Sequence, residues 1–217
     1  MLPLLAACLI AAGAVSAIGY LLWPTWNKNV VTTNPDLIPV SVGNTFFNIP
    51  SHAFRRHVQK QSGPQESIEL SYNYPSLSVP SAPKHVSVDN FDPNAQPIDR
   101  IFVTISAHHD IMSPEIRVST IYPRYLNDAA ASEHDGIVTR PFRDGSPYEG
   151  EDLFVGTTPA LVARCTRDGD TPGMCLSERR ISGADITFRF PLKWLAQWRD
   201  LAGAMETLAT HLNSPQG

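Results

Sequence analysis

Residues 160–190, ALVARCTRDGDTPGMCLSERRISGADITFRF, contain three apolar runs separated by turn-forming residues. Turn formers fill residues 166–173, and Ser182-Gly183 precedes the third run. Strands that follow one another through short turns form an antiparallel meander. The stretch therefore predicts three strands of an antiparallel sheet.

Two cysteines, Cys165 and Cys175, flank the first turn of this stretch. Cysteines on paired strands can face each other, and a disulfide closing a loop of this size contributes about 2.5–3 kcal/mol in the chain-entropy model. Because disulfides persist in oxidising compartments, we predict a Cys165–Cys175 disulfide and an extracytoplasmic domain. The alternative is a pair of reduced core cysteines in a domain that faces the cytosol.

Alternation of apolar and polar residues predicts further strands upstream. In residues 67–74, Ile68, Leu70 and Tyr72 share one face, which is the pattern of a strand half facing water. The same signals predict strands in 40–49 (a hairpin around Gly43-Asn44), 98–107, 137–142 and 153–155.

Two helices are predicted. Ser113-Pro114-Glu115 has the N-cap, first-turn proline and early acid of a helix start directed toward Tyr122, although alternation after Glu115 also permits a strand. The second helix follows Pro191 and runs to Leu212. Its apolar residues recur at steps of three and four, which predicts an amphipathic helix. They stand at 192, 195, 198, 201, 205, 208 and 212.

This last helix is expected to lie across the sheet and to bury Leu195, Trp198, Leu201 and Leu208; a partner-docking face is the alternative. Nineteen prolines among 217 residues exceed the usual share of about 5% and disfavour a helical bundle. The predicted fold class is α+β: an antiparallel-sheet domain with a C-terminal amphipathic helix packed on it, behind one N-terminal transmembrane helix.

The first 23 residues, MLPLLAACLIAAGAVSAIGYLLW, contain no charged residue and are long enough to cross a membrane as a helix. Trp23 and Trp26 suit the membrane–water boundary. A cleavable signal peptide and a lipoprotein signal ending at Cys8 are the alternatives. The predicted organisation is a transmembrane anchor at 1–26, a tether at 27–39, a globular domain at 40–212 and a flexible tail at 213–217.

The orientation signals disagree. Lys28, Arg55 and Arg56 follow the anchor and no basic residue precedes it, which by the positive-inside rule places the domain in the cytoplasm. The predicted disulfide favours the other side. We predict a single-pass inner-membrane protein whose domain faces the periplasm.

Composition and motifs favour a binding protein over an enzyme. The net charge of −4 gives no sign of a nucleic-acid-binding protein. The sequence lacks a G-x-S-x-G elbow, a P-loop, an H-E-x-x-H motif and a C-x-x-C pair. No catalytic, cofactor or metal residue is therefore assigned.

Two clusters nevertheless contain metal-ligating residue types: His108-His109-Asp110, and His134 with its neighbours Glu133 and Asp135. If the fold brought them together, three ligands and an open position could activate water. Ordinary polar residues at strand ends and in loops are the alternative. Calcium ligands at 89–94 and 168–170, a partner for the acidic stretch 148–152, and lipid phosphates at Arg55-Arg56-His57 are weaker hypotheses of the same kind.

The sequence thus predicts a membrane-anchored periplasmic protein that binds an envelope protein, as an accessory subunit or an immunity-type protein. The alternative is a metal-dependent envelope hydrolase that uses His108, His109, Asp110 and His134. A sensor or carrier of small envelope ligands is a third hypothesis. The expected partners are the membrane, through residues 1–26, and an envelope protein, with no nucleic acid.

Overall fold

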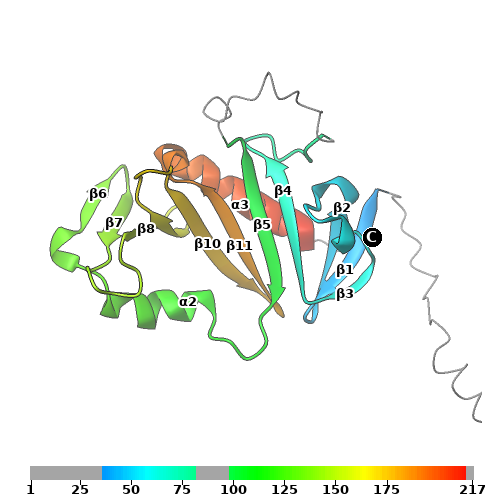
Figure 1. Ribbon diagram of the computed structural model, residues 1–217, viewed down its shortest axis with the longest axis horizontal. Coiled ribbons are helices and arrows are strands. Elements are labelled where there is room, and N and C mark those ends of the chain that lie inside the picture. Colours follow the sequence, from blue (N-terminus) through cyan, green and yellow to red (C-terminus); the bar gives the residue numbers. More distant parts are fainter. Residues whose placement is uncertain (1–35, 82–97, 214–217) are drawn as a thin grey trace, which may run out of the picture. The chain divides into compact units, whose positions relative to one another are not determined.

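The cysteine hairpin lies in the middle of an eight-stranded antiparallel sheet in a computed structural model of the protein (Figure 1). The structure describes residues 36–81 and 98–213. Cys165 and Cys175 stand directly opposite each other in the register of their strands and form a buried disulfide, as predicted. The strands, in spatial order, are β4 (Ser67–Asn73), β5 (Arg100–Ala107), β11 (Ala184–Pro191), β10 (Met174–Ile181), β9 (Leu161–Thr166), β8 (Glu151–Gly156), β7 (Ile137–Pro141) and β6 (Ser132–His134).

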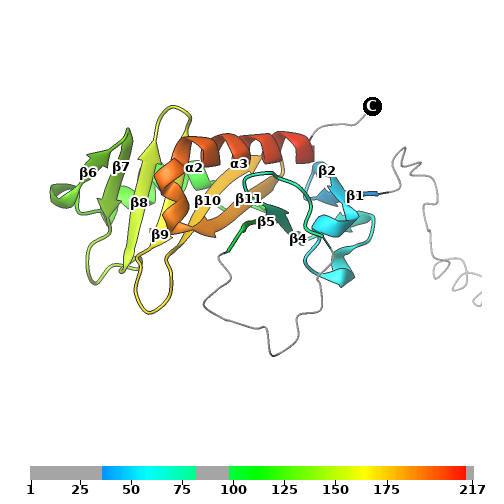
Figure 2. The same ribbon diagram turned by 90° about the horizontal axis from the view of Figure 1, so that it is seen from above.

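A second sheet has three strands in the order β2 (Thr45–Pro50), β1 (Leu37–Val42) and β3 (Gly63–Gln65). Strands β1 and β2 form the predicted hairpin around Gly43-Asn44, whereas β1 and β3 run parallel. Strand β1 begins three residues before residue 40, where the domain was predicted to start. Figure 2 shows this sheet and β6 at opposite ends of the domain.

The period of two divides the side chains of the larger sheet between two faces. On β9, Leu161, Ala163 and Cys165 point into the main core, whereas Val162 and Arg164 face the other side. Buried residues of β1 and β2 join those of β4, β5, β10 and β11 in this main core. The two sheets therefore share one core.

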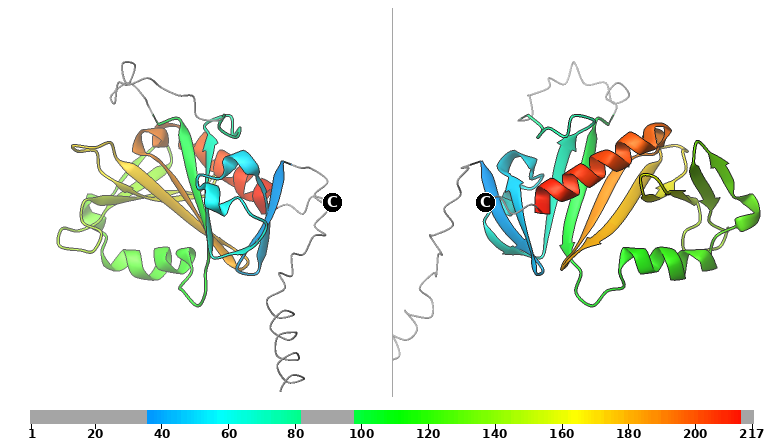
Figure 3. Two further views of the ribbon diagram at one scale, coloured as in Figure 1. Left: turned by 45° about the vertical axis from the view of Figure 1, so that its right-hand side comes forward. Right: turned by 180° about the vertical axis from the view of Figure 1, so that it is seen from behind.

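The C-terminal helix covers the main-core face, as Figure 3 shows. Leu195, Trp198, Leu201 and Leu208 are all buried, as predicted. The prediction of one uniform helix was wrong at its start: η7 (Leu192–Gln197) is a 3₁₀-helix that leads into the α-helix α3 (Trp198–Asn213). Apolar residues spaced by three match the three residues per turn of a 3₁₀-helix, and the later steps average the α-helical period.

The opposite face carries a second helical segment, formed by α2 (Pro114–Ile116), the π-helix η4 (Arg117–Ile121) and η5 (Tyr122–Arg124). The predicted helix start is confirmed, because the Ser113 side chain accepts a hydrogen bond from the Ile116 N–H at 3.3 Å. Tyr122 packs in a second core with Leu126, Phe142 and Leu153. The other short 3₁₀-helices are η1 (Ser51–Ala53), η2 (His57–Gln59) and η6 (Asp128–Ala130).

The domain is therefore α+β, a mostly antiparallel sheet with a C-terminal helix. Within residues 36–81 and 98–213, no helix is long and apolar enough to cross a membrane. The predicted anchor at 1–26, most of the predicted tether, the calcium hypothesis at 89–94 and residues 214–217 of the predicted tail lie outside the described residues.

Candidate functional site

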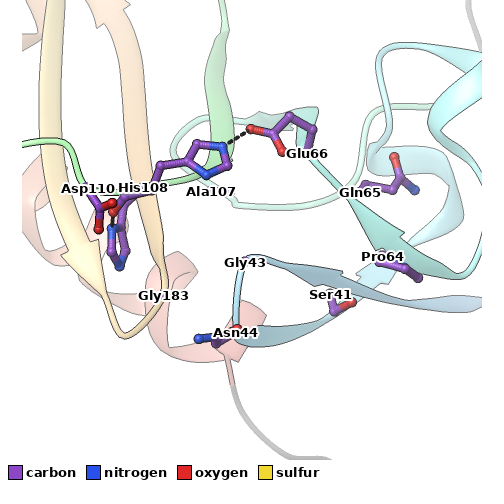
Figure 4. Close-up of a pocket in the computed structure, with 11 residues that line it drawn as sticks. Ser41, Gly43, Asn44, Pro64, Gln65, Glu66, Ala107, His108, Asp110 and Gly183 are labelled. Atoms are coloured by element: carbon purple, nitrogen blue, oxygen red, sulfur yellow. Dashed lines mark hydrogen bonds and ion pairs between the residues drawn. The ribbon is translucent and has the colours of Figure 1, made fainter.

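An open concavity of about 580 Å³ lies where the two sheets meet (Figure 4). Residues of the β1–β2 turn, of β3 and of the β10–β11 turn line it, together with Glu66, the last residue of β5 (Ala107) and the three residues that follow it. It thus contains His108, His109 and Asp110, one of the two clusters that the sequence singles out.

Two hairpin turns in direct contact build the wall of this concavity. Gly43 has a positive φ of 56°, and a Cβ placed there would stand 2.2 Å from the Gly183 carbonyl oxygen. Only glycine fits so close an approach in that conformation. The buried Thr45 hydroxyl donates to the Ile181 carbonyl at 3.2 Å and accepts from the Gly183 N–H at 2.8 Å. These contacts fix the two sheets relative to each other at the site.

The two histidines of the concavity have separate partners. His109 has a positive φ of 44°, and its Nε2 lies 2.6 Å from Glu66 Oε1. Both side chains of this pair are more than 60% exposed, so the pair contributes at most about 1 kcal/mol. His108 Nδ1 contacts the His109 carbonyl, and Figure 4 places His108 beside Asp110, away from Glu66. In the part of the chain that the structure describes, no serine or threonine hydroxyl is bonded to either ring.

Beyond Asp110, three large apolar side chains face solvent within six residues: Ile111, Met112 and Ile116 are 61%, 44% and 49% exposed. Met112 Sδ lies 3.9 Å from Thr120 Oγ1, so Met112 folds back beside the helix that contains Ile116. We call residues 111–116 the apolar segment. Clustered exposed apolar side chains with a polar rim are typical of protein-binding surfaces.

Arg180 of β10 holds the apolar segment in place. Its guanidinium donates to both carboxylate oxygens of Asp185, at 2.7 and 3.0 Å, and to the Ile111 carbonyl at 2.9 Å. Hydrogen bonding to Asp185 raises the pKa of Arg180. Glu115 accepts from the Arg180 backbone N–H at 3.0 Å. The apolar segment is therefore fixed to the sheet at both ends.

Acidification is expected to release the Glu115 contact. Burial raises the pKa of Glu115, but hydrogen bonds from Arg180, its own N–H and Ser113 together hold it below its ordinary value of 4.5. A carboxyl with a lowered folded-state pKa contributes stability above about pH 4.5, and this is lost as pH falls through the folded-state pKa. We expect the Arg180 amide resonance to titrate by NMR with a midpoint below 4.5. A midpoint at or above that value, or an unchanged transition in Glu115→Gln, would contradict the assignment.

The structure does not bring the two histidine clusters together, so the alternative hypothesis of one combined metal site finds no support. His108 to Asp110 follow β5, whereas His134 ends β6, and five strands of the sheet lie between β5 and β6. Among the described residues, no group of three or more histidine, cysteine, aspartate or glutamate side chains has the geometry to hold a metal ion. Asp135 instead binds Arg199, with Oδ2 2.6 Å from Nη1.

The remaining acidic stretches are occupied within the fold. Glu151 pairs with Arg164 at 2.5 Å, and Asp152 pairs with Arg167 at 2.8 Å. Asp168 accepts from the Gly173 N–H at 2.7 Å, a bond from an aspartate side chain to the backbone that is typical of turns.

Sequence reasoning missed Glu66, the exposure of the apolar segment and the Arg180–Asp185 pair. The sequence carries a signal for the apolar segment. The apolar pair Ile111-Met112 stands between a polar cluster and a helix cap, where a loop is expected to be polar.

No family model matches the chain, and a search of curated proteins finds no match. The α+β domain is similar to a solved structure of Smlt3025, an immunity protein of the Stenotrophomonas maltophilia type IV secretion system. The TM-score is 0.52 and the identity 11%, over 83% of this chain and 94% of that chain. A second structure, the Neisseria meningitidis iron-regulated outer membrane lipoprotein FrpD, has a TM-score of 0.45 at 11% identity, over 82% of this chain and 91% of that one. The likeness to Smlt3025 shows a shared fold.

Proposed function

We propose that the chain is a single-pass inner-membrane protein, with an anchor at 1–26, a tether that ends before β1 at Leu37 and a binding domain in the periplasm. The uncharged run of 23 residues supports the anchor. The buried disulfide supports the periplasmic side, because the cytosol keeps thiols reduced.

The domain binds an envelope protein, as an accessory subunit or an immunity-type protein that neutralises a toxin. The exposed apolar segment carries this proposal. It contains three of the six large apolar side chains that are exposed in the described residues. The fold shared with Smlt3025 supports the immunity-type role, since that protein is an immunity protein.

The apolar segment has the properties of a protein-binding hot spot rather than of a small-molecule pocket. Its three large apolar side chains are exposed, and hydrogen bonds between Arg180 and both Ile111 and Glu115 hold the segment in place. A surface that is already ordered loses less entropy on binding, which favours affinity. The charged residues Asp110, Glu115 and Arg117 provide a polar rim around the apolar side chains.

The test is extraction of the tagged full chain from native membranes in mild detergent, followed by affinity purification and mass spectrometry. We expect a stoichiometric companion whose capture depends on the apolar segment. A toxin as companion assigns the immunity role, and a resident envelope subunit assigns the accessory role. A solitary protein, or a companion captured equally well by the variant described next, would contradict the proposal.

Ile111→Asp/Met112→Asp is expected to weaken binding of this companion at least 30-fold, which corresponds to a hot-spot loss of about 2 kcal/mol. Both side chains are exposed, so the melting temperature should change little. Val58→Asp is the matched control, because Val58 is 71% exposed and lies outside the apolar segment. Surface plasmon resonance with the purified companion measures both variants.

A further inference from the structure

A second concavity, of about 600 Å³, has a basic lining, and none of the described residues that line it carries a carboxylate. We call it the basic pocket; its ionisable lining residues are His52, Arg55, His57, Lys60 and Arg100. The chain as a whole has a net charge of −4, so the positive charge of this pocket is opposite in sign to the net charge of the protein. Like charges gathered around one hollow repel one another, and an anion bound between them relieves that repulsion.

Two cations of the basic pocket, Arg55 and Arg100, have carboxylate partners, but these ion pairs are long and exposed. Arg55 lies over the Phe102 ring at 4.7 Å and 3.6 Å from Glu69, which it shares with Arg56 at 3.3 Å. Among the described residues, the carboxylate within ion-pair distance of Arg100 is that of its chain neighbour Asp99, at 3.7 Å. Exposed pairs of this kind are weak and exchange readily for another anion.

Lys60 and the Ser71 hydroxyl complete the set of donors. Within the described residues, Lys60 has no carboxylate within ion-pair distance, and Ser71, a residue only 7% exposed, also lines the pocket. The Ser71 hydroxyl can donate a hydrogen bond to a ligand oxygen in the pocket. Arginine guanidinium groups and a lysine around one hollow match the several acceptor oxygens of a phosphate group.

We propose that the basic pocket binds a phosphate group, either of a phospholipid head group or of a soluble phosphate ester. The chain path favours the lipid source. The Ser51 N–H donates to the Asp36 carbonyl at 2.8 Å, so the start of the described chain is bonded to the segment that continues into His52 of the pocket. Residues 1–35, which include the proposed anchor, precede Asp36 in the sequence.

The test uses the full chain in nonionic detergent at low ionic strength, with isothermal titration calorimetry against two soluble probes. Inorganic phosphate represents the free anion, and glycerophosphoglycerol represents the diester head group of an anionic phospholipid. Lys60→Gln/Arg100→Gln is expected to raise the Kd of the bound probe about 25-fold, at about fivefold per basic residue. Arg124→Gln/Lys193→Gln removes the same charge from exposed residues outside the pocket and should change the Kd less than twofold.

Either probe can bear out the proposal. A diester that binds at least as tightly as inorganic phosphate, despite its lower charge, identifies a lipid head group. Inorganic phosphate that binds at least tenfold more tightly identifies a soluble phosphate. Absence of saturable binding by both probes, or an equal loss in the two double variants at unchanged melting temperature, overturns the proposal and leaves the basic pocket for acidic groups of a protein partner.

Discussion

Trp198→Ala is expected to lower the free energy of unfolding by about 3–5 kcal/mol, as for other buried tryptophans. Trp198 begins α3, is 2% exposed and lies against Gly156 of β8. Its Nε1–H donates to the Asp135 carbonyl at 3.1 Å, in the β6–β7 turn. The substitution therefore leaves a cavity and also removes a hydrogen bond that ties the β6–β8 end of the sheet to the helix.

Urea unfolding measures this effect, with Trp194→Ala as the matched control. Trp194 lies in the preceding 3₁₀-helix, is only partly buried and stacks on Tyr74 with ring centroids 4.2 Å apart. Its removal should cost clearly less. A loss for Trp198→Ala no larger than that for Trp194→Ala would contradict the anchoring role.

The contact between Trp198 and Gly156 can also be tested by substituting the glycine. A Cβ at residue 156 would stand 2.5 Å from Cζ3 of the Trp198 ring, so Gly156→Ala must displace a buried side chain. Overpacking of this kind costs about 1–3 kcal/mol. In the double variant with Trp198→Ala the clash disappears, so the two losses should not add.

The fold was largely predictable because its periodicities are local. Ile68, Leu70 and Tyr72 alternate strictly and form the buried face of β4. The helix over 198–212 was predictable in the same way, because its apolar residues recur every three or four positions, as the α-helical period requires. The 3₁₀ start at Leu192 was missed because steps of three and four were read as one pattern. A 3₁₀-helix has three residues per turn, so it fits the steps of three at Leu192 but not the later steps of four.

The candidate site was less predictable because it depends on contacts between residues far apart in the chain. His109 meets Glu66 across 43 residues, and the Ile111 carbonyl meets Arg180 across 69. No local pattern encodes such pairs. An isoleucine in a sequence is expected to be buried. The exposure of Ile111 can be recognised only from the structure, where Ile111 lies outside the hydrophobic core.

Removing the disulfide by Cys165→Ala/Cys175→Ala is expected to lower the free energy of unfolding by about 2.5–3 kcal/mol. The bond closes a loop with a sequence separation of 10 residues, and its loss restores the conformational freedom of that loop in the unfolded chain. For a domain of this size, the melting temperature should fall by about 5–12 °C. Both cysteines are buried in the main core, so alanine is a better replacement than serine, whose hydroxyl would lack a partner.

Calorimetry with and without reductant separates the bond from the side chains. Reductant should lower the melting temperature of the wild-type chain toward that of the double variant and leave the variant unchanged. An equal response of both would mean that the bond contributes nothing to stability. The same bond tests the proposed topology, because non-reducing peptide mapping of protein from native membranes should recover residues 165 and 175 as one linked pair. Free thiols at both positions would place the domain in a reducing compartment, and the proposal of a periplasmic partner would fail with it.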